Sequence, residues 1–299
     1  MAEEPPIEIS QPQSGSFKQV SERVRRLVAT NASPFTFTGT CTYIVGRGEA
    51  AIIDPGPDDE AHIAALLAAV KGERVRDILV THSHRDHFGG AARLAAETGA
   101  KIVGSPILAL RGPAGGPAAA RDRAYTPDRP LNDGDVVDGP GYALTVVATP
   151  GHARNHLCFA LAEESALFSG DHVMAWSTTV IAPPDGEMGP YMASLEKLRD
   201  RGETIYWPGH GGPVTDPARY VRSLIHHRRQ REAAILARLE AGDETVAAIA
   251  AKVYANLATP LIGAARMSTF AHLIDLVGRG LATCDGEPAL QSVYRAASR

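Results

Sequence analysis

The feature that most constrains this chain is the segment of residues 81–90, which reads THSHRDHFGG. It holds four residues that commonly bind metals within six positions: His82, His84, Asp86 and His87. The apolar run at 75–80 predicts a buried strand before the segment, and 91–97 predicts a helix after it. The segment would then lie at the carboxyl end of a strand, where open α/β sheets usually hold ligands. Because imidazole and carboxylate suit zinc, manganese or iron, it predicts a metal site.

The alternative for this segment is an ordinary polar loop with surface histidines. We disfavour it, because clustered His and Asp side chains are costly to hold together without a metal. Alternate residues of extended backbone point the same way, so His82 and His84 can share one ion. Asp86 and His87 lie past the turn and can reach a second ion.

Three later segments repeat the pattern of a strand followed by a metal-binding residue. Each places one His or Asp just beyond an apolar run and beside Gly or Pro. The runs are 144–148, 166–168 and 204–206, and the residues beyond them are His152, Asp171 and His210. This repetition is more specific than any single motif, so we expect all three residues to join the same site.

With these motifs in this order, the chain resembles the metallo-β-lactamase superfamily over roughly residues 30 to 215. The motifs are His-x-His-x-Asp-His at 82–87, Gly-His at 151–152, Gly-Asp at 170–171 and Gly-His at 209–210. The resemblance implies two divalent metal ions, with zinc expected and manganese or iron accepted by the same ligands. It implies the following ligands: His82, His84 and His152 for one ion, Asp86, His87 and His210 for the other, and Asp171 as the carboxylate that bridges both.

The same resemblance implies an α+β fold, the four-layer αβ/βα sandwich of two similar halves with the site at their seam. After it, three helices are predicted at 220–240, 245–253 and 261–281. They resemble the small winged-helix-like C-terminal domain of the endoribonuclease branch, and residues 31–46 resemble that branch too. The expected organisation is an N-terminal extension (1–17), the sandwich domain (18–216) and the helical winged-helix-like domain (217–299).

Composition limits the biological context. A net charge of −4 and a pI near 6.3 exclude a globally basic nucleic-acid binder. No apolar run of about 18 residues is present, so we expect no membrane span. Residues 1–6 have neither a basic start nor an apolar stretch, so we expect no signal peptide. Three scattered cysteines fit a reducing compartment. We therefore expect a cytoplasmic protein.

Four residues near the predicted ligands, and one residue away from the ligand pattern, have roles that the motifs leave open. Asp54 would orient a ligand from behind or cap the next turn. His156 would orient a ligand or lie in the core, and His172 would support the ligands from behind. Tyr191 would pack or donate to a substrate oxyanion. His62, on a helix predicted at 59–70 with Asp59 as its N-cap, would be a surface residue.

Two basic segments suggest contacts with anions. On the first C-terminal helix, Arg228, Arg229 and Arg231 would either contact nucleic-acid phosphates or form a solvated helix face. The loop predicted at 111–130 carries four arginines and would be a lid over an anionic substrate or an ordinary solvated loop. A homodimer through the C-terminal helices is a further assembly that the chain could adopt.

The expected activity is that of a binuclear metal-dependent hydrolase. Two metal ions lower the pKa of a shared water, and the bridging hydroxide attacks a carbonyl or a phosphorus. Asp86 and Asp171 would hold this water and shuttle its proton. The favoured substrate is a phosphodiester or single-stranded RNA, because both terminal regions resemble the endoribonuclease branch. The alternative is a thioester or ester hydrolase of the glyoxalase II type, or a lactonase.

Three other activities are disfavoured. True β-lactamases of this fold are usually exported and lack a bridging Asp at the position of Asp171. Flavodiiron proteins, which reduce oxygen or nitric oxide, normally carry Glu where this chain has His84, and they add a flavodoxin domain. A non-catalytic binding protein would be expected to have lost ligands, and the motifs here keep them all.

Overall fold

The computed structural model describes residues 11–106 and 125–297. The larger part of the predicted N-terminal extension and most of the predicted loop at 111–130 lie outside these residues, and so do Arg111, Arg121 and Arg123. Arg129 is described; it lies in a short strand, with Nη2 at 3.4 Å from Asp77 Oδ1. No helix in the described ranges is long and apolar enough to cross a membrane.

The first half of the chain forms one mixed sheet whose strands follow sequence order. Its first four strands pair antiparallel, and the later ones pair parallel, with helices in the connections that follow the fourth and fifth strands. The strands are β1 (Phe17–Gln19), β2 (Val24–Val28), β3 (Cys41–Arg47), β4 (Glu49–Ile53), β5 (Arg74–Val80), β6 (Lys101–Gly104) and β7 (Arg129–Pro130). The helices are α1 (Glu60–Ala69), α2 (Arg85–Phe88) and α3 (Ala91–Thr98). Parallel pairing brings the carboxyl ends of β4, β5 and β6 to one edge.

The second half forms a smaller sheet in the order β12-β11-β10-β9-β8. The pairs are antiparallel except β11 with β12, which are parallel and joined through α5 (Met188–Arg199). Its strands are β8 (Val136–Gly139), β9 (Tyr142–Ala148), β10 (Leu157–Leu161), β11 (Ala166–Gly170) and β12 (Ile205–Pro208), with a 3-10 turn η2 at Ala162–Glu164. α5 begins at Met188, so Tyr191 lies inside the helix.

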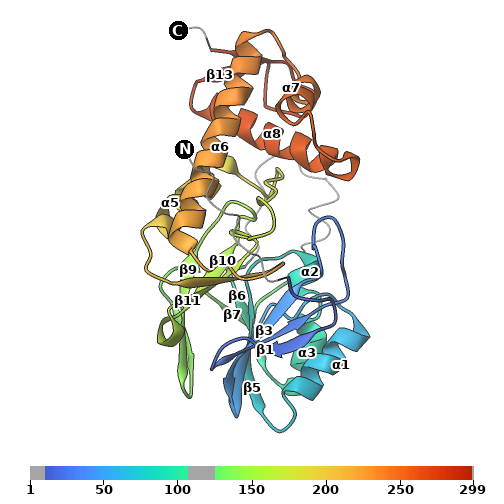
Figure 1. The fold of residues 1–299 in the computed structure, drawn as a ribbon, viewed down its shortest axis with the longest axis vertical. Coiled ribbons are helices and arrows are strands. Elements are labelled where there is room, and N and C mark those ends of the chain that lie inside the picture. Colours follow the sequence, from blue (N-terminus) through green and yellow to red (C-terminus); the bar gives the residue numbers. More distant parts are fainter. Residues whose placement is uncertain (1–10, 107–124, 298–299) are drawn as a thin grey trace, which may run out of the picture.

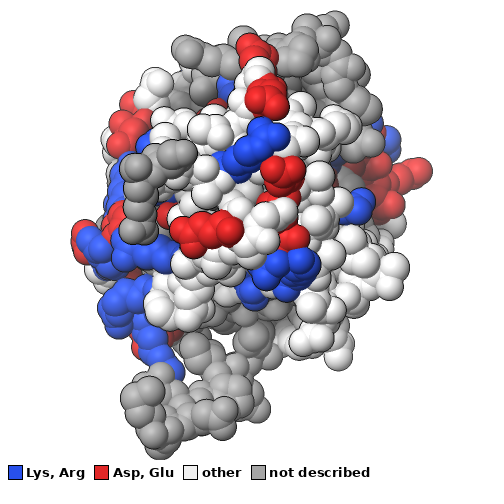
Figure 2. Space-filling view, turned by 90° about the horizontal axis from the view of Figure 1, so that it is seen from above, with Lys and Arg blue, Asp and Glu red and all other residues white. Residues whose placement is uncertain are grey.

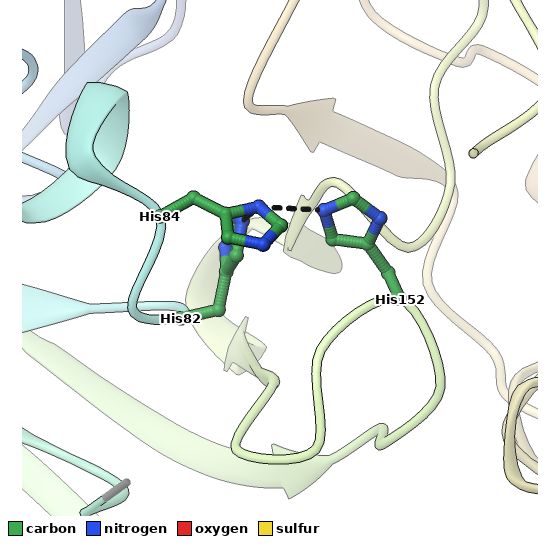
Figure 3. Close-up of side chains that lie close together, drawn as sticks. All are labelled: His82, His84 and His152. Carbon is green, nitrogen blue, oxygen red and sulfur yellow. Dashed lines mark hydrogen bonds between the residues drawn. The ribbon is translucent and has the colours of Figure 1, made fainter. Parts of the chain in front are cut away.

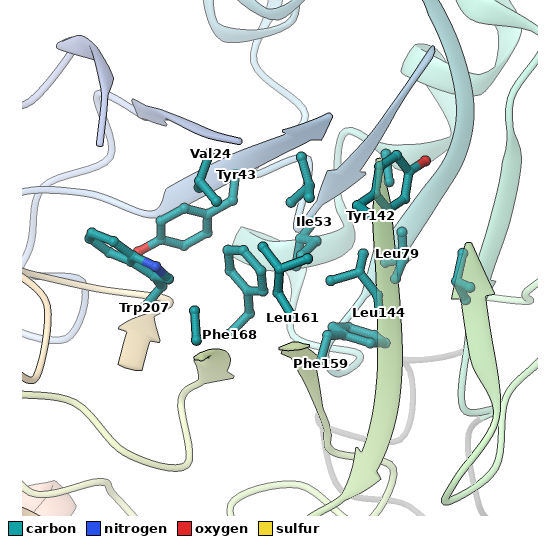
Figure 4. Packing of buried hydrophobic residues seen from close by; sticks show 14 of the residues in the cluster. Val24, Tyr43, Ile53, Leu79, Tyr142, Leu144, Phe159, Leu161, Phe168 and Trp207 are labelled. Atoms are coloured by element: carbon teal, nitrogen blue, oxygen red, sulfur yellow. The ribbon is translucent and has the colours of Figure 1, made fainter. Parts of the chain in front are cut away.

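The main core lies between the two sheets (Figure 4). Alternating apolar residues of both sheets meet there, and the large rings of Tyr43, Phe168 and Trp207 pack with centroids 5.2 and 6.1 Å apart from Tyr43. The Tyr43 hydroxyl donates to the Pro208 carbonyl at 2.7 Å, which ties β3 to β12. Separate apolar clusters pack α1 and α3 on the outside of the first sheet and α5 on the outside of the second. The predicted four-layer sandwich is confirmed.

The C-terminal helices lie at one end of the molecule, beyond the sandwich (Figure 1). They are α6 (Pro217–Glu240), α7 (Val246–Val253), a 3-10 turn η3 (Thr259–Leu261) and α8 (Ile262–Gly278), followed by a two-stranded sheet of β13 (Ala282–Cys284) and β14 (Tyr294–Ala296). The sequence did not indicate these two strands. α6 belongs to two cores, because Val221 and Leu224 pack on the second sheet while Ile235 and Leu239 pack on α7 and α8. The winged-helix comparison and the domain boundaries stay predictions.

The interpretation of His62 as a surface residue is wrong. Asp59 caps α1 as predicted, accepting from the His62 amide at 2.8 Å, but the His62 ring turns inward and is only 5% exposed. Its Nε2 lies 3.1 Å from the Thr42 hydroxyl, which itself donates to the Asp54 carbonyl. Helical periodicity could not reveal this, because the polar partner lies on β3. Burial lowers the pKa of His62 to about 4, against the opposing effect of Asp59.

Stability should therefore depend on pH through His62. An unfolded histidine has a pKa of about 6.5, so between pH 6.5 and 4 the unfolded state binds the proton and the folded state does not. The contribution of neutral, buried His62 to the unfolding free energy is therefore present above pH 6.5 and is lost as the pH falls toward 4. From pH 7 to pH 5, the unfolding free energy of His62→Gln should fall by about 2 kcal/mol less than that of the wild type. Denaturant titrations at both pH values measure this; exposed His226→Gln is the control. Equal pH dependence in all three proteins would exclude the effect.

Candidate metal centre

The loops that follow four strands meet at the seam between the two sheets. The β5 loop and α2 carry the first motif, and the segments after β9, β11 and β12 carry the later residues. The seam is closed locally by backbone pairing, since the Cys41 amide donates to the Gly209 carbonyl at 2.7 Å and Thr40 bridges His210. The structure brings all seven predicted ligands together: His82, His84, Asp86, His87, His152, Asp171 and His210.

One group of donors consists of three imidazoles (Figure 3). His84 Nδ1 lies 2.9 Å from His82 Nε2 and 3.0 Å from His152 Nε2. His82 and His84 approach from the β5 loop, and His152 approaches from the opposite side on the β9 loop. Three ring nitrogens from both halves of the sandwich thus point at one place.

A second group lies beside the first and contains Asp86, His87 and His210. The Asp86 Oδ2 atom is 3.5 Å from His87 Nε2 and 3.3 Å from His210 Nε2. The two imidazole nitrogens are 3.3 Å apart. This group likewise joins the two halves, because His210 follows β12 while the other two residues belong to α2.

Asp171 lies between the two groups. Its Oδ1 is 3.4 Å from His87 Nε2, and its Oδ2 is 3.4 Å from His210 Nε2 and 3.6 Å from His152 Nε2. Asp171 Oδ1 is buried and has no hydrogen-bond partner within the described residues. A buried carboxylate oxygen without a donor is costly unless a cation faces it. From this position one carboxylate could reach ions in both groups.

Four of the imidazoles direct their Nδ1 atom away from the seam. The hydrogen bond made by Nδ1 determines whether Nε2 is free to bind a metal. These nitrogens face the Thr81 hydroxyl, an Asp54 oxygen and two carbonyls. The pairs are His82 Nδ1 with Thr81 Oγ1 at 2.9 Å, His87 Nδ1 with Asp54 Oδ2 at 2.8 Å, His152 Nδ1 with Val180 O at 2.8 Å and His210 Nδ1 with Gly39 O at 3.3 Å. Proton donation there leaves an unprotonated nitrogen facing the seam in each neutral ring.

The donor set fits divalent cations. Nitrogens at about 2.0–2.1 Å around tetrahedral zinc are about 3.3 Å apart, close to the spacings observed in both groups. Unprotonated nitrogens and carboxylates that face one another repel unless a cation lies among them. Both groups could therefore hold metal ions.

The pKa shifts of the histidines at the seam also indicate a site that attracts positive charge. Burial alone lowers the pKa of His210, but Asp171 and Asp86 outweigh it and raise the pKa to about 9. At His87, burial also lowers the pKa, but three surrounding carboxylates outweigh it. Asp171, Asp86 and Asp54 raise the pKa of His87 well above its usual value. Burial and the neighbouring His84 lower the pKa of His152 to about 4. The carboxylates thus attract positive charge to the second group, while the lowered pKa of His152 keeps that ring neutral.

Asp54 orients ligands and does not cap a turn. It is buried with a left-handed φ of 50°, and its oxygens accept from the Thr81 amide and hydroxyl and from His87 Nδ1, each at 2.8 Å. The Thr81 hydroxyl in turn faces His82 Nδ1. One carboxylate therefore fixes a ring in each group, which supports the ligand-orienting interpretation.

His156, His172 and Tyr191 lie behind the ligands. The Asp171 amide donates to His156 Nε2 at 3.2 Å, so His156 positions the bridging residue. The His172 ring contacts the rings of His156 and Tyr191 at tilted angles, with centroids 5.7 and 4.6 Å away. The fully buried Tyr191 donates its hydroxyl to the His172 carbonyl at 3.2 Å. This arrangement matches the packing interpretation of Tyr191 and leaves its hydroxyl engaged.

Sequence reasoning missed the contacts that hold the ligands from outside the motifs. Asp185 Oδ2 lies 3.6 Å from His84 Nε2, and Asp185 Oδ1 accepts from the Arg154 amide at 3.1 Å. The Val180 and Gly39 carbonyls face His152 and His210. The Pro-Pro-Asp-Gly turn at 183–186 was a visible loop signal. Backbone carbonyls carry no sequence signal at all.

The phosphate-contact interpretation does not fit Arg228. Its side chain is buried, donates to the Thr179 carbonyl and lies over the Tyr191 ring at 5.2 Å. Arg231 donates to the Val253 carbonyl at 2.9 Å and lies over Tyr254. Arg229 is exposed, and its guanidinium pairs with Glu196 at 2.7 Å. The helix is packed against the protein on the side that carries Arg228, so the run of charge is not one solvated face.

Removing ligands should remove metal in a defined pattern. Asp171→Ala deletes the carboxylate that reaches both groups, so the purified protein should retain neither ion after dialysis. His84→Ala should mainly lose the ion of the His82 group. Elemental analysis gives the metal content per chain, and His226→Ala, on an exposed helix face, should match the wild type. Unchanged metal content in Asp171→Ala would show that the ligand assignment is wrong.

Weakening the support behind the ligands should lower metal affinity without unfolding the chain. Asp54→Asn keeps the size of the side chain and tolerates the left-handed φ, but it loses the charge that holds His87. Metal affinity should fall about 10–100-fold, as is usual for such supporting partners. Competition with a chromophoric chelator measures it. Asp59→Asn, which still caps α1, is the control; if Asp54→Asn binds metal as tightly as this control, the supporting role is excluded.

Comparison with known proteins agrees with this geometry. Residues 35–210 match the family described as "Metallo-beta-lactamase superfamily". A beta-lactamase-like protein 2 homolog of Caenorhabditis elegans is 33% identical over 80% of this chain and 79% of that protein. An atrochrysone carboxyl ACP thioesterase of Aspergillus fumigatus is 34% identical over 74% of this chain and 66% of that protein.

A similar solved structure is that of a metallo-beta-lactamase family protein from Thermus thermophilus. It superposes with a TM-score of 0.76 at 25% identity, covering 93% of this chain and all of that one. The superposition extends over the C-terminal helices as well as the sandwich, because it takes in nearly the whole chain. The chain therefore belongs to the metallo-β-lactamase superfamily and is a hydrolase.

Proposed function

We propose that this hydrolase is a binuclear metal-dependent thioesterase that releases an acyl group from a thiol carrier. The observation that carries the proposal is the pair of donor groups that face each other across Asp171. The choice of a thioester follows from similarity to a protein named as an acyl carrier protein (ACP) thioesterase. The sequence predicts, as the alternative to phosphodiester cleavage, a thioester or ester hydrolase of the glyoxalase II type or a lactonase; an acyl-carrier thioesterase shares the thioester chemistry of the first of these.

The donor set is suited to zinc, and manganese or iron accept the same ligands. Bound ions of this kind activate a water and polarise the substrate carbonyl. The chain contributes the proton acceptors. The Asp86 side chain is 30% exposed and that of Asp171 is 9% exposed, so Asp86 is the carboxylate with a route to solvent. We assign Asp86 the transfer of a proton from the attacking water and Asp171 the alignment of that water between the groups.

The preference for RNA or another phosphodiester has weaker support. All three arginines proposed to contact phosphate are engaged with the chain itself: Arg228 and Arg231 with backbone carbonyls, and Arg229 with Glu196. On the face seen in Figure 2, acidic side chains are interspersed among the basic ones. Neither observation favours a phosphate-binding surface there. Phosphodiester cleavage stays a prediction, as do the glyoxalase II type and lactonase activities, and one experiment can compare them all.

That experiment is hydrolysis of a substrate panel by the metal-loaded protein. It contains an acyl-CoA thioester, an acyl-ACP, S-lactoylglutathione, an acyl-homoserine lactone, bis-p-nitrophenyl phosphate and single-stranded RNA. We expect chelator-sensitive turnover of the acyl thioesters. Asp86→Asn should lower kcat about 10²–10⁴-fold, because a positioned proton acceptor contributes that much. His226→Ala should keep wild-type activity.

Two results would contradict the proposal. Cleavage of RNA or the phosphate diester with silent thioesters would favour the endoribonuclease-like alternative. Thioester turnover that persists in the chelated protein would separate the activity from the metal centre.

A further inference from the structure

Arg228 of α6 is a buried cation that the proposed chemistry does not use. It is 2% exposed, and no ion pair among the described residues includes it. Burying a charge away from a counter-ion is costly unless hydrogen bonds and packing compensate. The contacts that Arg228 makes therefore indicate which part of the structure this buried side chain holds in place.

Those contacts lead to the metal centre in two steps. The Arg228 guanidinium donates to the Thr179 carbonyl and lies over the Tyr191 ring. The next residue, Val180, presents its carbonyl to His152 Nδ1 at 2.8 Å. This carbonyl sets which His152 nitrogen faces the seam, so Arg228 holds the backbone next to an orienting contact.

The segment 179–181 is held from other sides as well. The Ile181 amide lies 3.5 Å from Ser268 Oγ of α8, so a second C-terminal helix contacts the residue after Val180. The Thr179 hydroxyl donates to the Asp171 carbonyl at 2.6 Å. One short segment therefore joins α6 and α8 to both His152 and Asp171.

We propose that Arg228 is a positioning residue for the His82–His84–His152 group, and that the C-terminal helices complete this half of the metal centre. The inference rests on the proposed function only in that this group binds a metal ion. The His87 and His210 rings are held without these helices, by Asp54 and the Gly39 carbonyl. Thr179 contacts Asp171 at its backbone carbonyl, not at its carboxylate. Loss of Arg228 should weaken one ion and spare the other.

The test compares Arg228→Gln with Arg229→Gln, a neighbour on the same helix that is exposed. Both proteins are stripped of metal, their thermal unfolding is recorded, and zinc is titrated back in competition with a chromophoric chelator. Cobalt(II) absorption then reports the geometry of each occupied site. Arg228→Gln should bind one ion as the wild type does and the other about 10–100-fold more weakly. Arg229→Gln should bind both as the wild type does.

A conservative variant separates positioning from general folding. Arg228→Lys keeps the buried charge but cannot present the planar fork, so its affinity for the weaker ion should lie between Gln and wild type. Selective loss of one ion from a stripped protein that still unfolds cooperatively supports positioning.

Other outcomes would overturn the inference. Two ions bound with wild-type affinity in Arg228→Gln would exclude the positioning role. Equal weakening of both ions, together with a lower unfolding temperature of the stripped protein, would assign Arg228 to folding alone. A wild-type chain that binds no ion would instead contradict the proposed function itself, and the inference would fail with it.

Discussion

Mutual repulsion among ligand atoms at the seam is the constraint on which the rest of this structure depends. Five imidazoles and two carboxylates point inward, with neighbouring ligand atoms 2.9 to 3.6 Å apart, and most of these side chains are buried. Such an arrangement persists only if each side chain is held from behind and a cation compensates in front. The two-sheet sandwich supplies the rigid part of this support, because every ligand follows or lies close to the end of a strand that is fixed in the common core.

The support is divided between the two halves of the chain. Asp54 and the Thr81 hydroxyl, at the ends of β4 and β5, fix His87 and His82 through a short hydrogen-bonded chain. His152 depends on the Val180 carbonyl, in a segment that touches α6 and α8. The C-terminal helices thus have a role in the centre that does not require nucleic-acid binding. This role also explains why Arg228 is buried although the run of charged residues around it on α6 looks like a solvated helix face.

The ligands could be predicted because their signals are local: apolar runs of strand length, each followed by His or Asp beside Gly or Pro. The four-layer sandwich could be predicted from the family resemblance that these motifs carry. The errors have the opposite origin. His62 and Arg228 were assigned to the surface or to phosphate contact from their own helices, whereas their positions are decided by Thr42 and Thr179, far away in sequence. The Val180 and Gly39 carbonyls could not be found, since any residue supplies a carbonyl. The β13–β14 pair was missed because its strands are only three residues each.

X-ray absorption spectroscopy of the zinc-loaded protein tests the central claim most directly. The account predicts a first shell of nitrogen and oxygen at about 2.0–2.1 Å and a metal–metal distance of about 3.5–4 Å, as in two-metal hydrolytic sites. Cys41 and Cys158 are buried and bonded elsewhere, so no sulfur should contribute. Two results would contradict a centre built from two facing donor groups bridged by Asp171. One is a single zinc per chain without a metal–metal signal, and the other is a zinc–sulfur shell at about 2.3 Å.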